Sequence, residues 1–181
     1  MSPQFCPHCR TPLILAAVQG RDREQCPACG FTAYHNPAPV ALALIEHAGE
    51  LVLIKRNLEP LRGYWAPPGG YVEVGESVEE AVVREAREET GLEIAVDALV
   101  GVYSQADVKV VILAYRAHSL GGEPVVGDDA GDILLVAPGQ VPVQPPPPHG
   151  TALDHWFHRV IREVTTPWQW GHQPVPRSMR R

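Results

Sequence analysis

Residues 70–92 read GYVEVGESVEEAVVREAREETGL, the most informative part of the sequence. Ser77 followed by Glu80 is the pattern of a capping box, and Gly91 is a typical helix terminator. The segment therefore predicts a helix from Val78 to Thr90, with an acidic cluster on its last turns.

The acidic cluster is formed by Glu85, Glu88 and Glu89. At about 100° per residue, Glu85 and Glu89 lie roughly 40° apart around the helix axis, with Glu88 about 60° to the other side of Glu85. Like charges at this spacing, at the helix end that favours cations, destabilise a helix unless something neutralises them. Oxygen ligands of this kind suit Mg2+ or Mn2+, which bridge to phosphates. The cluster points to metal-assisted hydrolysis of a phosphoanhydride.

A solvated helix face paired with Arg84 and Arg87 is the plain alternative for these carboxylates. The preceding residues 65–73, WAPPGGYVE, argue against it. They form a Pro/Gly turn between a short apolar run and the helix, where backbone groups can face a ligand. We therefore favour the metal site.

Length and charge limit the classes of function. The 181 residues provide one domain of ordinary size with a remainder, and the net charge of −6 leaves no broad basic field for long DNA or RNA. No run of eighteen apolar residues occurs, and the N-terminus lacks a basic region followed by an apolar core. We expect a cytoplasmic protein that does not enter a membrane.

All four cysteines lie near the N-terminus, in two C-x2-C pairs separated by sixteen residues: Cys6, Cys9, Cys26 and Cys29. This spacing predicts a closed structural Zn2+ site of four thiolates. Disulfides are unusual in the cytoplasm, and a redox C-x-x-C needs a βαβ context that is absent here. We expect a zinc ribbon over residues 1–36, folded by its metal and separate from the catalytic ion.

The rest of the chain predicts a β-rich domain over residues 37–164. Apolar runs at 40–45 and 51–54 flank a turn and predict a hairpin, and further β-rich runs cover 98–104, 109–116 and 133–136.

Two features follow these strands. Residues 142–148 are rich in proline and predict a stiff polyproline spacer, with a partner-docking motif as the alternative. A helix is predicted over 152–164, because apolar residues recur at helical spacing and form a core-facing stripe: Leu153, Trp156, Phe157, Val160 and Ile161. The tail, 165–181, lacks periodicity and is either disordered or packed back on the domain.

The pattern G-x5-E-x7-R-E-U-x-E-E-x-G-U, with U an aliphatic residue, describes residues 70–92, although Ala86 is small for its position. This pattern resembles the signature of the Nudix hydrolases. Together with the cysteines, the chain looks like the Nudix enzymes that carry a zinc ribbon. The resemblance implies an α/β fold, an α/β/α sandwich with a mixed sheet preceded by a small zinc-ribbon module. Related enzymes are often dimers, so a homodimer is an expectation.

The resemblance also implies roles for residues of the motif. The carboxylates of Glu85, Glu88 and Glu89 would bind Mg2+ or Mn2+, with the Gly70 carbonyl as a further ligand. Arg84 would orient a glutamate, and Glu76 would be a supporting carboxylate or an additional ligand. Glu88, Glu89 or an acid outside the motif would orient the attacking water.

Candidate residues for substrate binding lie outside the motif. Asp129 and Asp132 match an acidic loop of related enzymes, although a solvated turn is an equal alternative. Tyr34, Trp65 and Tyr71 offer aromatic faces to a base, with ordinary packing as the alternative. Arg56 would contact a phosphate, or else pair with Glu59 at the surface.

The implied reaction cleaves a nucleoside diphosphate linked to another moiety, with ADP-ribose and FAD first and NADH next, and releases AMP plus a phosphate ester. The motif that marks NADH pyrophosphatases is replaced here by Ser104-Gln105-Ala106-Asp107-Val108, which weakens an assignment to NADH. The alternatives are hydrolysis of an oxidised nucleoside triphosphate, and a regulatory module that senses a nucleotide without turnover.

Overall fold

The computed structural model describes residues 4–127, 130–137, 139–144, 146–147 and 150–169. The chain divides into two compact units, Met1–Asn36 and Pro37–Arg181. In the first unit, strands β1 (Ile14–Val18) and β2 (Arg21–Gln25) form an antiparallel hairpin. Both turn residues between them have positive φ, 51° at Gln19 and 77° at Gly20, which suits the twist of a two-residue hairpin.

The second unit contains one sheet. Its strands are β3 (Ala38–His47), β4 (Glu50–Arg56), β5 (Trp65–Ala66), β6 (Gly69–Tyr71), β7 (Glu93–Tyr103), β8 (Val110–Gly121) and β9 (Ala130–Val136). The order is β5-β4-β3-β8-β7, with β6 also paired to β3 and β9 to β4. Strands β3 and β8 are parallel and the other pairs are antiparallel, so the sheet is mixed.

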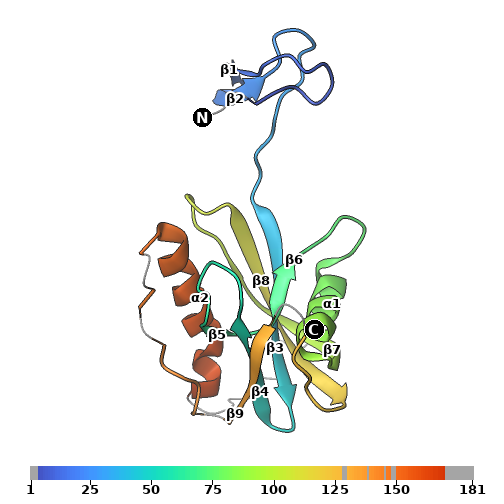
Figure 1. Ribbon diagram of the computed structural model, residues 1–181, viewed down its shortest axis with the longest axis vertical. Coiled ribbons are helices and arrows are strands. Elements are labelled where there is room, and N and C mark those ends of the chain that lie inside the picture. The colour runs from blue at the N-terminus through green and yellow to red at the C-terminus, as the bar shows by residue number, and fades with distance from the viewer. Residues whose placement is uncertain (1–3, 128–129, 138, 145, 148–149, 170–181) are drawn as a thin grey trace, which may run out of the picture. The chain divides into compact units, whose positions relative to one another are not determined.

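Two helices cover opposite faces of this sheet (Figure 1). Helix α1 (Val78–Thr90) buries Ala81, Val82 and Ala86 in one core, and helix α2 (Ala152–Gln169) buries Trp156, Phe157, Val160, Ile161 and Val164 in the other. Strand β3 supplies both cores in alternation, because successive side chains of a strand point to opposite faces. The expected α/β/α sandwich is confirmed.

Some elements differ from the prediction. Strand β7 begins at Glu93 and β8 ends at Gly121, so both are longer than their apolar runs. Helix α2 continues five residues past Val164, because Thr165 is buried there and its hydroxyl donates to the Ile161 carbonyl at 2.8 Å. The expected tail therefore begins inside a helix, and residues 170–181 lie outside the described part.

The proline-rich segment is more than a spacer. The side-chain amide of Gln144 accepts from the Trp65 N–H and donates to the Trp65 carbonyl, both at 2.6 Å, as a neighbouring strand would. The Tyr64 hydroxyl also donates to the Pro146 carbonyl at 3.0 Å. These bonds hold the segment against β5. None of the described helices is long and apolar enough to cross a membrane.

Candidate active site

Helix α1 places the acidic cluster, and both of its ends are fixed by caps. The Ser77 hydroxyl accepts from the Glu80 N–H at 3.2 Å, and the Glu80 carboxylate accepts from the Ser77 N–H at 2.7 Å. At the other end Gly91 adopts φ 68° and donates its N–H to the Arg87 carbonyl at 2.9 Å. The predicted caps are confirmed, and they fix which residues of α1 face the sheet.

Arg84 lies at the centre of the charged side chains on α1. Its guanidinium donates to both oxygens of Glu76 at 2.8 and 3.0 Å, to Glu85 at 2.7 Å and to Glu88 at 3.0 Å. It also donates to the Tyr71 carbonyl at 2.9 Å. Bonds from Arg84, helped by the Glu73 N–H, lower the pKa of Glu76 to about 2. Arg84 therefore neutralises the cluster and ties α1 to the loop before it.

The turn that contains strand β6 brings backbone groups to the carboxylates. The Gly69 N–H donates to the buried Glu89 carboxylate at 2.7 Å. A Cβ at Gly70 would lie 2.3 Å from the Glu85 Oε1 atom, so any larger residue here would displace the Glu85 carboxylate. Burial raises the pKa of Glu85, against the opposing effect of Arg84.

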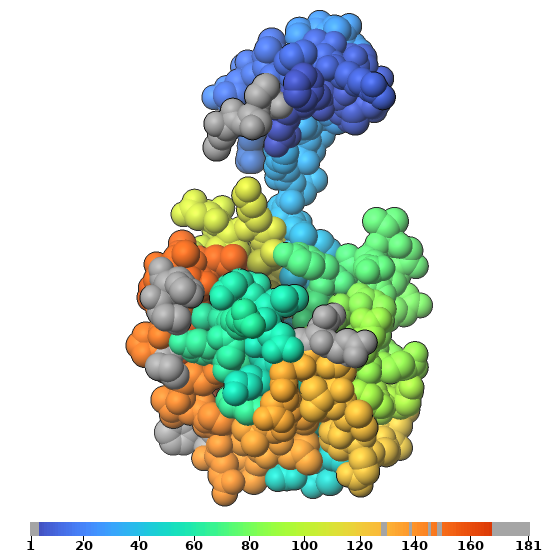
Figure 2. Space-filling view, in the orientation of Figure 1, coloured from blue at the N-terminus to red at the C-terminus, as the bar shows by residue number. Residues whose placement is uncertain are grey.

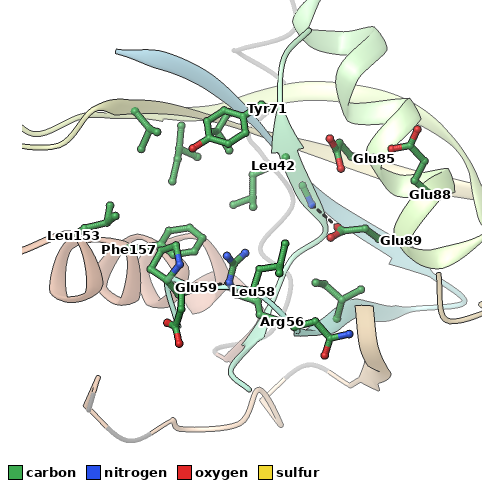
Figure 3. A pocket seen from close by; sticks show the side chains of 18 of the residues that line it. Leu42, Arg56, Leu58, Glu59, Tyr71, Glu85, Glu88, Glu89, Leu153 and Phe157 are labelled. Carbon is green, nitrogen blue, oxygen red and sulfur yellow. Dashed lines mark hydrogen bonds between the residues drawn. The ribbon is translucent and has the colours of Figure 1, made fainter. Parts of the chain in front are cut away.

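A cavity of about 440 Å³ opens beside these carboxylates. Glu85, Glu88 and Glu89 line one side, and Leu153 and Phe157 of α2 line the opposite side (Figure 3). Residues Arg56 to Pro60 form a third wall, and the loop that contains them lies at the surface of this unit (Figure 2). The cavity therefore has an acidic end and an apolar end.

Arg56 lies between these two ends. Its guanidinium carbon is 4.9 Å from the centre of the Phe157 ring, and its Nε donates to the Pro60 carbonyl at 2.8 Å. Burial lowers the pKa of Arg56, and the negative charges of Glu89 and Glu59 oppose this shift. These contacts fix the positively charged guanidinium of Arg56 in the cavity, where it can contact an anionic substrate.

The acidic end of the cavity offers oxygen donors of the kind that bind divalent cations. Carboxylate oxygens of Glu85 and Glu89, which lie against the backbone of Gly70 and Gly69, are the hard ligands that Mg2+ and Mn2+ prefer. Arg84 donates to both Glu85 and Glu88, at 2.7 and 3.0 Å. Within the described ranges, four cysteines are the only group of three or more possible ligands already gathered within 4.8 Å.

The structure places the predicted substrate-binding residues in different regions. Arg56 and Tyr71 line the cavity. Tyr34 lies in the first unit, where its ring centre is 4.6 Å from the Arg23 guanidinium, and Trp65 packs against the core under α2. The Asp132 carboxylate accepts from the Ile133 N–H at 2.9 Å and does not line the cavity, and Asp129 lies outside the described residues.

Sequence reasoning missed the apolar end of the cavity. Leu153, Trp156 and Phe157 were assigned to the core, and the last two are indeed buried, but all three also line the cavity. Leu153 is 38% exposed, which is high for a core residue at this spacing. A stripe of core residues gives no sign that its first turn borders a cavity.

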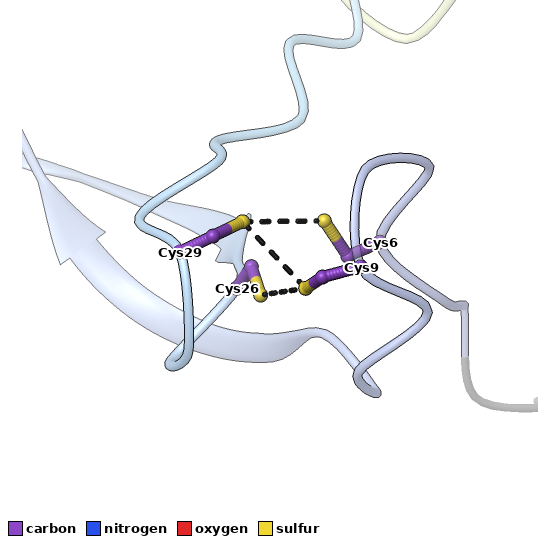
Figure 4. A group of neighbouring side chains, drawn as sticks. All are labelled: Cys6, Cys9, Cys26 and Cys29. Atoms are coloured by element: carbon purple, nitrogen blue, oxygen red, sulfur yellow. Dashed lines mark hydrogen bonds between the residues drawn. The ribbon is translucent and has the colours of Figure 1, made fainter.

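The four cysteines of the first unit converge on one point (Figure 4). Sγ separations are 3.5 Å for Cys6 and Cys29, 3.4 Å for Cys9 and Cys26, and 3.7 Å for Cys9 and Cys29. The two C-x2-C turns are alike, because the Arg10 N–H donates to the Cys6 carbonyl and the Gly30 N–H to the Cys26 carbonyl. The cluster could bind a metal, and four thiolates in this arrangement fit a structural zinc site.

Comparisons with known proteins agree with this architecture. ADP-ribose pyrophosphatase of Methanocaldococcus jannaschii is 45% identical over 104 residues, 55% of this chain and 62% of the relative. NAD-capped RNA hydrolase NudC of Pseudomonas aeruginosa is 35% identical over 129 residues, 70% of this chain and 44% of the relative. The chain thus spans less than two thirds of the length of these relatives.

The similarity to a solved structure covers more of the chain than the similarity to these relatives does. The crystal structure of a NUDIX hydrolase from Nitrosomonas europaea superposes with a TM-score of 0.78 at 27% identity, over 92% of this chain and 90% of that one. The NUDIX domain matches residues 35–163. This range contains helix α1, most of the buried face of α2, the cavity and the acidic cluster, and the chain therefore belongs to the NUDIX domain family.

Proposed function

We propose that this protein hydrolyses the diphosphate bond of a nucleoside diphosphate linked to another moiety, with Mg2+ or Mn2+ bound at the acidic end of the cavity. The observation that supports this proposal is that Glu85 and Glu89 reach the same cavity as Arg56. Carboxylates for a cation and a fixed guanidinium for a phosphate thus lie in one space. A solvated helix face would need neither the buried Glu89 nor the Gly70 approach.

Glu85, Glu89 and, after release from Arg84, Glu88 would hold the cation, with the Gly70 carbonyl as a further ligand. The cation supplies positive charge against the diphosphate and acidifies a water molecule. Arg84 orients Glu85 through the 2.7 Å bond, and Glu76 keeps Arg84 in place through two bonds. Glu88 or Glu89 would accept the proton of the attacking water, for which general-base help adds about 10²- to 10⁴-fold.

Arg56 would bind the phosphate that lies farther from the cation. Its Nε is already engaged by the Pro60 carbonyl, and its guanidinium rests on the Phe157 ring, so little conformational entropy is lost when a phosphate binds. The apolar end, formed by Leu153, Phe157 and Tyr71, would contact an uncharged ring of the substrate.

ADP-ribose is the first substrate to test, because a relative with this activity in its name is 45% identical over 104 residues. FAD and NADH follow, and NudC relatives add an NAD-linked substrate to the set. The acidic charge of the chain, −6, argues against long RNA as a substrate. Zinc in the cysteine cluster would stabilise the first unit and take no part in the reaction.

A substrate panel tests the proposal. Purified protein would be incubated with Mg2+ or Mn2+ and with ADP-ribose, FAD, NADH, coenzyme A, diadenosine polyphosphates or 8-oxo-dGTP, and products would be resolved by mass spectrometry. We expect AMP plus a phosphate ester from ADP-ribose, FAD or NADH, and none after EDTA treatment. Nucleotide binding without turnover of any compound would replace this proposal by the sensing module.

A further inference from the structure

The end of helix α1 is held by a short segment of chain that precedes β9. The Val125 N–H donates to the Thr90 carbonyl at 2.8 Å, and the Gly127 N–H donates to the Glu89 carbonyl at 3.1 Å. These carbonyls belong to the last turn of the helix, which has no partners for them within the helix itself. Residues 125–127 therefore act as an external cap on the turn that carries Glu88 and Glu89.

Only glycine fits at position 127. A Cβ there would lie 1.7 Å from the Glu88 carbonyl oxygen and 3.0 Å from the Glu89 Cα. Both neighbours are backbone atoms of a helix, so they cannot swing aside as the end of a flexible side chain would. The contact joins the backbone of the segment directly to the two residues that would bind the cation.

The same segment leads to the opposite side of the cavity. The Ala130 N–H donates to the Gly127 carbonyl at 3.2 Å, and Ala130 begins β9, where it lies opposite Arg56 of β4. Gly127 is thus hydrogen-bonded to the first residue of β9, the strand that pairs with β4 opposite Arg56. A shift at Gly127 would change the position of the carboxylates relative to Arg56.

We propose that Gly127 is a positioning residue that fixes the last turn of α1, and with it the direction of the Glu88 and Glu89 carboxylates. This inference rests on the proposed function, because it assigns these carboxylates to a cation. A helix end without partners frays, and a frayed turn would hold the two side chains in many directions. Docking of residues 125–127 removes this freedom before the metal binds.

The first test is Mn2+ binding measured by electron paramagnetic resonance, without substrate. We expect Gly127→Ala to raise the Kd for Mn2+ by about 10- to 100-fold, as for other residues that support metal ligands. Gly101→Ala on β7 is the matched control, because the three atoms nearest to its Cβ belong to one side chain: the Tyr103 hydroxyl at 3.0 Å and two ring carbons at 3.1 Å. We expect wild-type affinity for this control.

The second test uses wild-type protein, so it holds even if Gly127→Ala does not fold. Coupling between two sites is reciprocal, so a cation bound by the carboxylates must also stabilise the docked segment. Hydrogen exchange at the Val125 and Gly127 amides should slow when saturating Mg2+ is added, while core amides of β8 change little. Exchange that is unaffected by the metal would overturn the role of Gly127.

The outcomes separate the two proposals. A wild-type protein that binds no Mn2+ would overturn the proposed function itself. Equal Mn2+ affinity of folded Gly127→Ala and wild type, with turnover by both, would overturn only the positioning role.

Discussion

Replacement of Gly70 by alanine tests how closely the activity depends on the position of one carboxylate. The new Cβ would lie 2.3 Å from Glu85 Oε1, and Cβ atoms do not approach other heavy atoms within 3.0 Å, so the carboxylate must retreat by about 0.7 Å. This retreat also strains the 2.7 Å bond between Arg84 and Glu85.

A shift of this size has different effects on folding and on activity. The group that moves is the end of a flexible side chain, so we expect a loss of about 1 kcal/mol in stability, or about 2–4 °C in Tm. A misplacement near 1 Å at a catalytic site costs about 10²-fold in rate. Gly70→Ala should therefore remain folded while kcat for ADP-ribose, or for whichever dinucleotide the panel identifies, falls about 100-fold.

The assay is the rate of AMP release at saturating Mg2+, with Tm measured on the same preparation. Gly101→Ala, on β7 outside the cavity lining, is the control and should keep wild-type kcat. If folded Gly70→Ala kept more than half of the wild-type kcat, the geometry at Glu85 would not limit the reaction, and our reasoning would be refuted.

Three further predictions concern charge, metal and substrate. The pKa of Glu76 is lowered from 4.5 to about 2, so its bonds to Arg84 stabilise the fold above pH 4.5, and this stabilisation is lost as pH falls toward 2. We therefore expect the unfolding free energy of Glu76→Gln, measured by urea titration, to change less between pH 7 and pH 3 than that of the wild type. An equal change in both proteins would argue against the bonds between Glu76 and Arg84. Cys26→Ser should release zinc and make residues 1–36 sensitive to protease. If protease cut the second unit of this variant as fast as residues 1–36, the result would contradict a separate module that is folded by its metal. Arg56→Gln should raise KM about 10- to 100-fold, because a charge-assisted bond is worth about 1.5–3 kcal/mol, and steady-state kinetics with an unchanged KM would remove Arg56 from the phosphate site.

Features set by neighbouring residues were predictable from the sequence. The caps of α1 need only Ser77, Glu80 and Gly91, and the helix has the predicted bounds. The cysteine cluster follows from spacing alone, because each C-x2-C turn brings its own two sulfurs together. The buried stripe of α2 follows from helical periodicity.

Features that depend on distant contacts were not predictable. Strands β5 and β6 have two and three residues, and they exist because β4 and β3 offer free edges to the Pro/Gly segment. Arg56 lies against Phe157, which follows about one hundred residues later in the chain. A contact between residues so far apart leaves no local pattern in the sequence. The sequence left Trp65 between base recognition and ordinary packing, and the contacts that favour packing come from distant residues: Gln144 bonds the Trp65 backbone, and the ring packs against the core under α2.

Glu89→Gln removes one charge from the last turn of α1 and so tests whether these carboxylates carry out metal-dependent hydrolysis. In the wild-type protein the Gly69 N–H donates to the Glu89 carboxylate at 2.7 Å. The side-chain oxygen of a glutamine can accept the same bond, so the local fold should persist. AMP release with Mg2+ would be compared between the variant and wild type at equal Tm. We expect a loss of at least about 10²-fold. Wild-type rates in the folded variant would contradict the account.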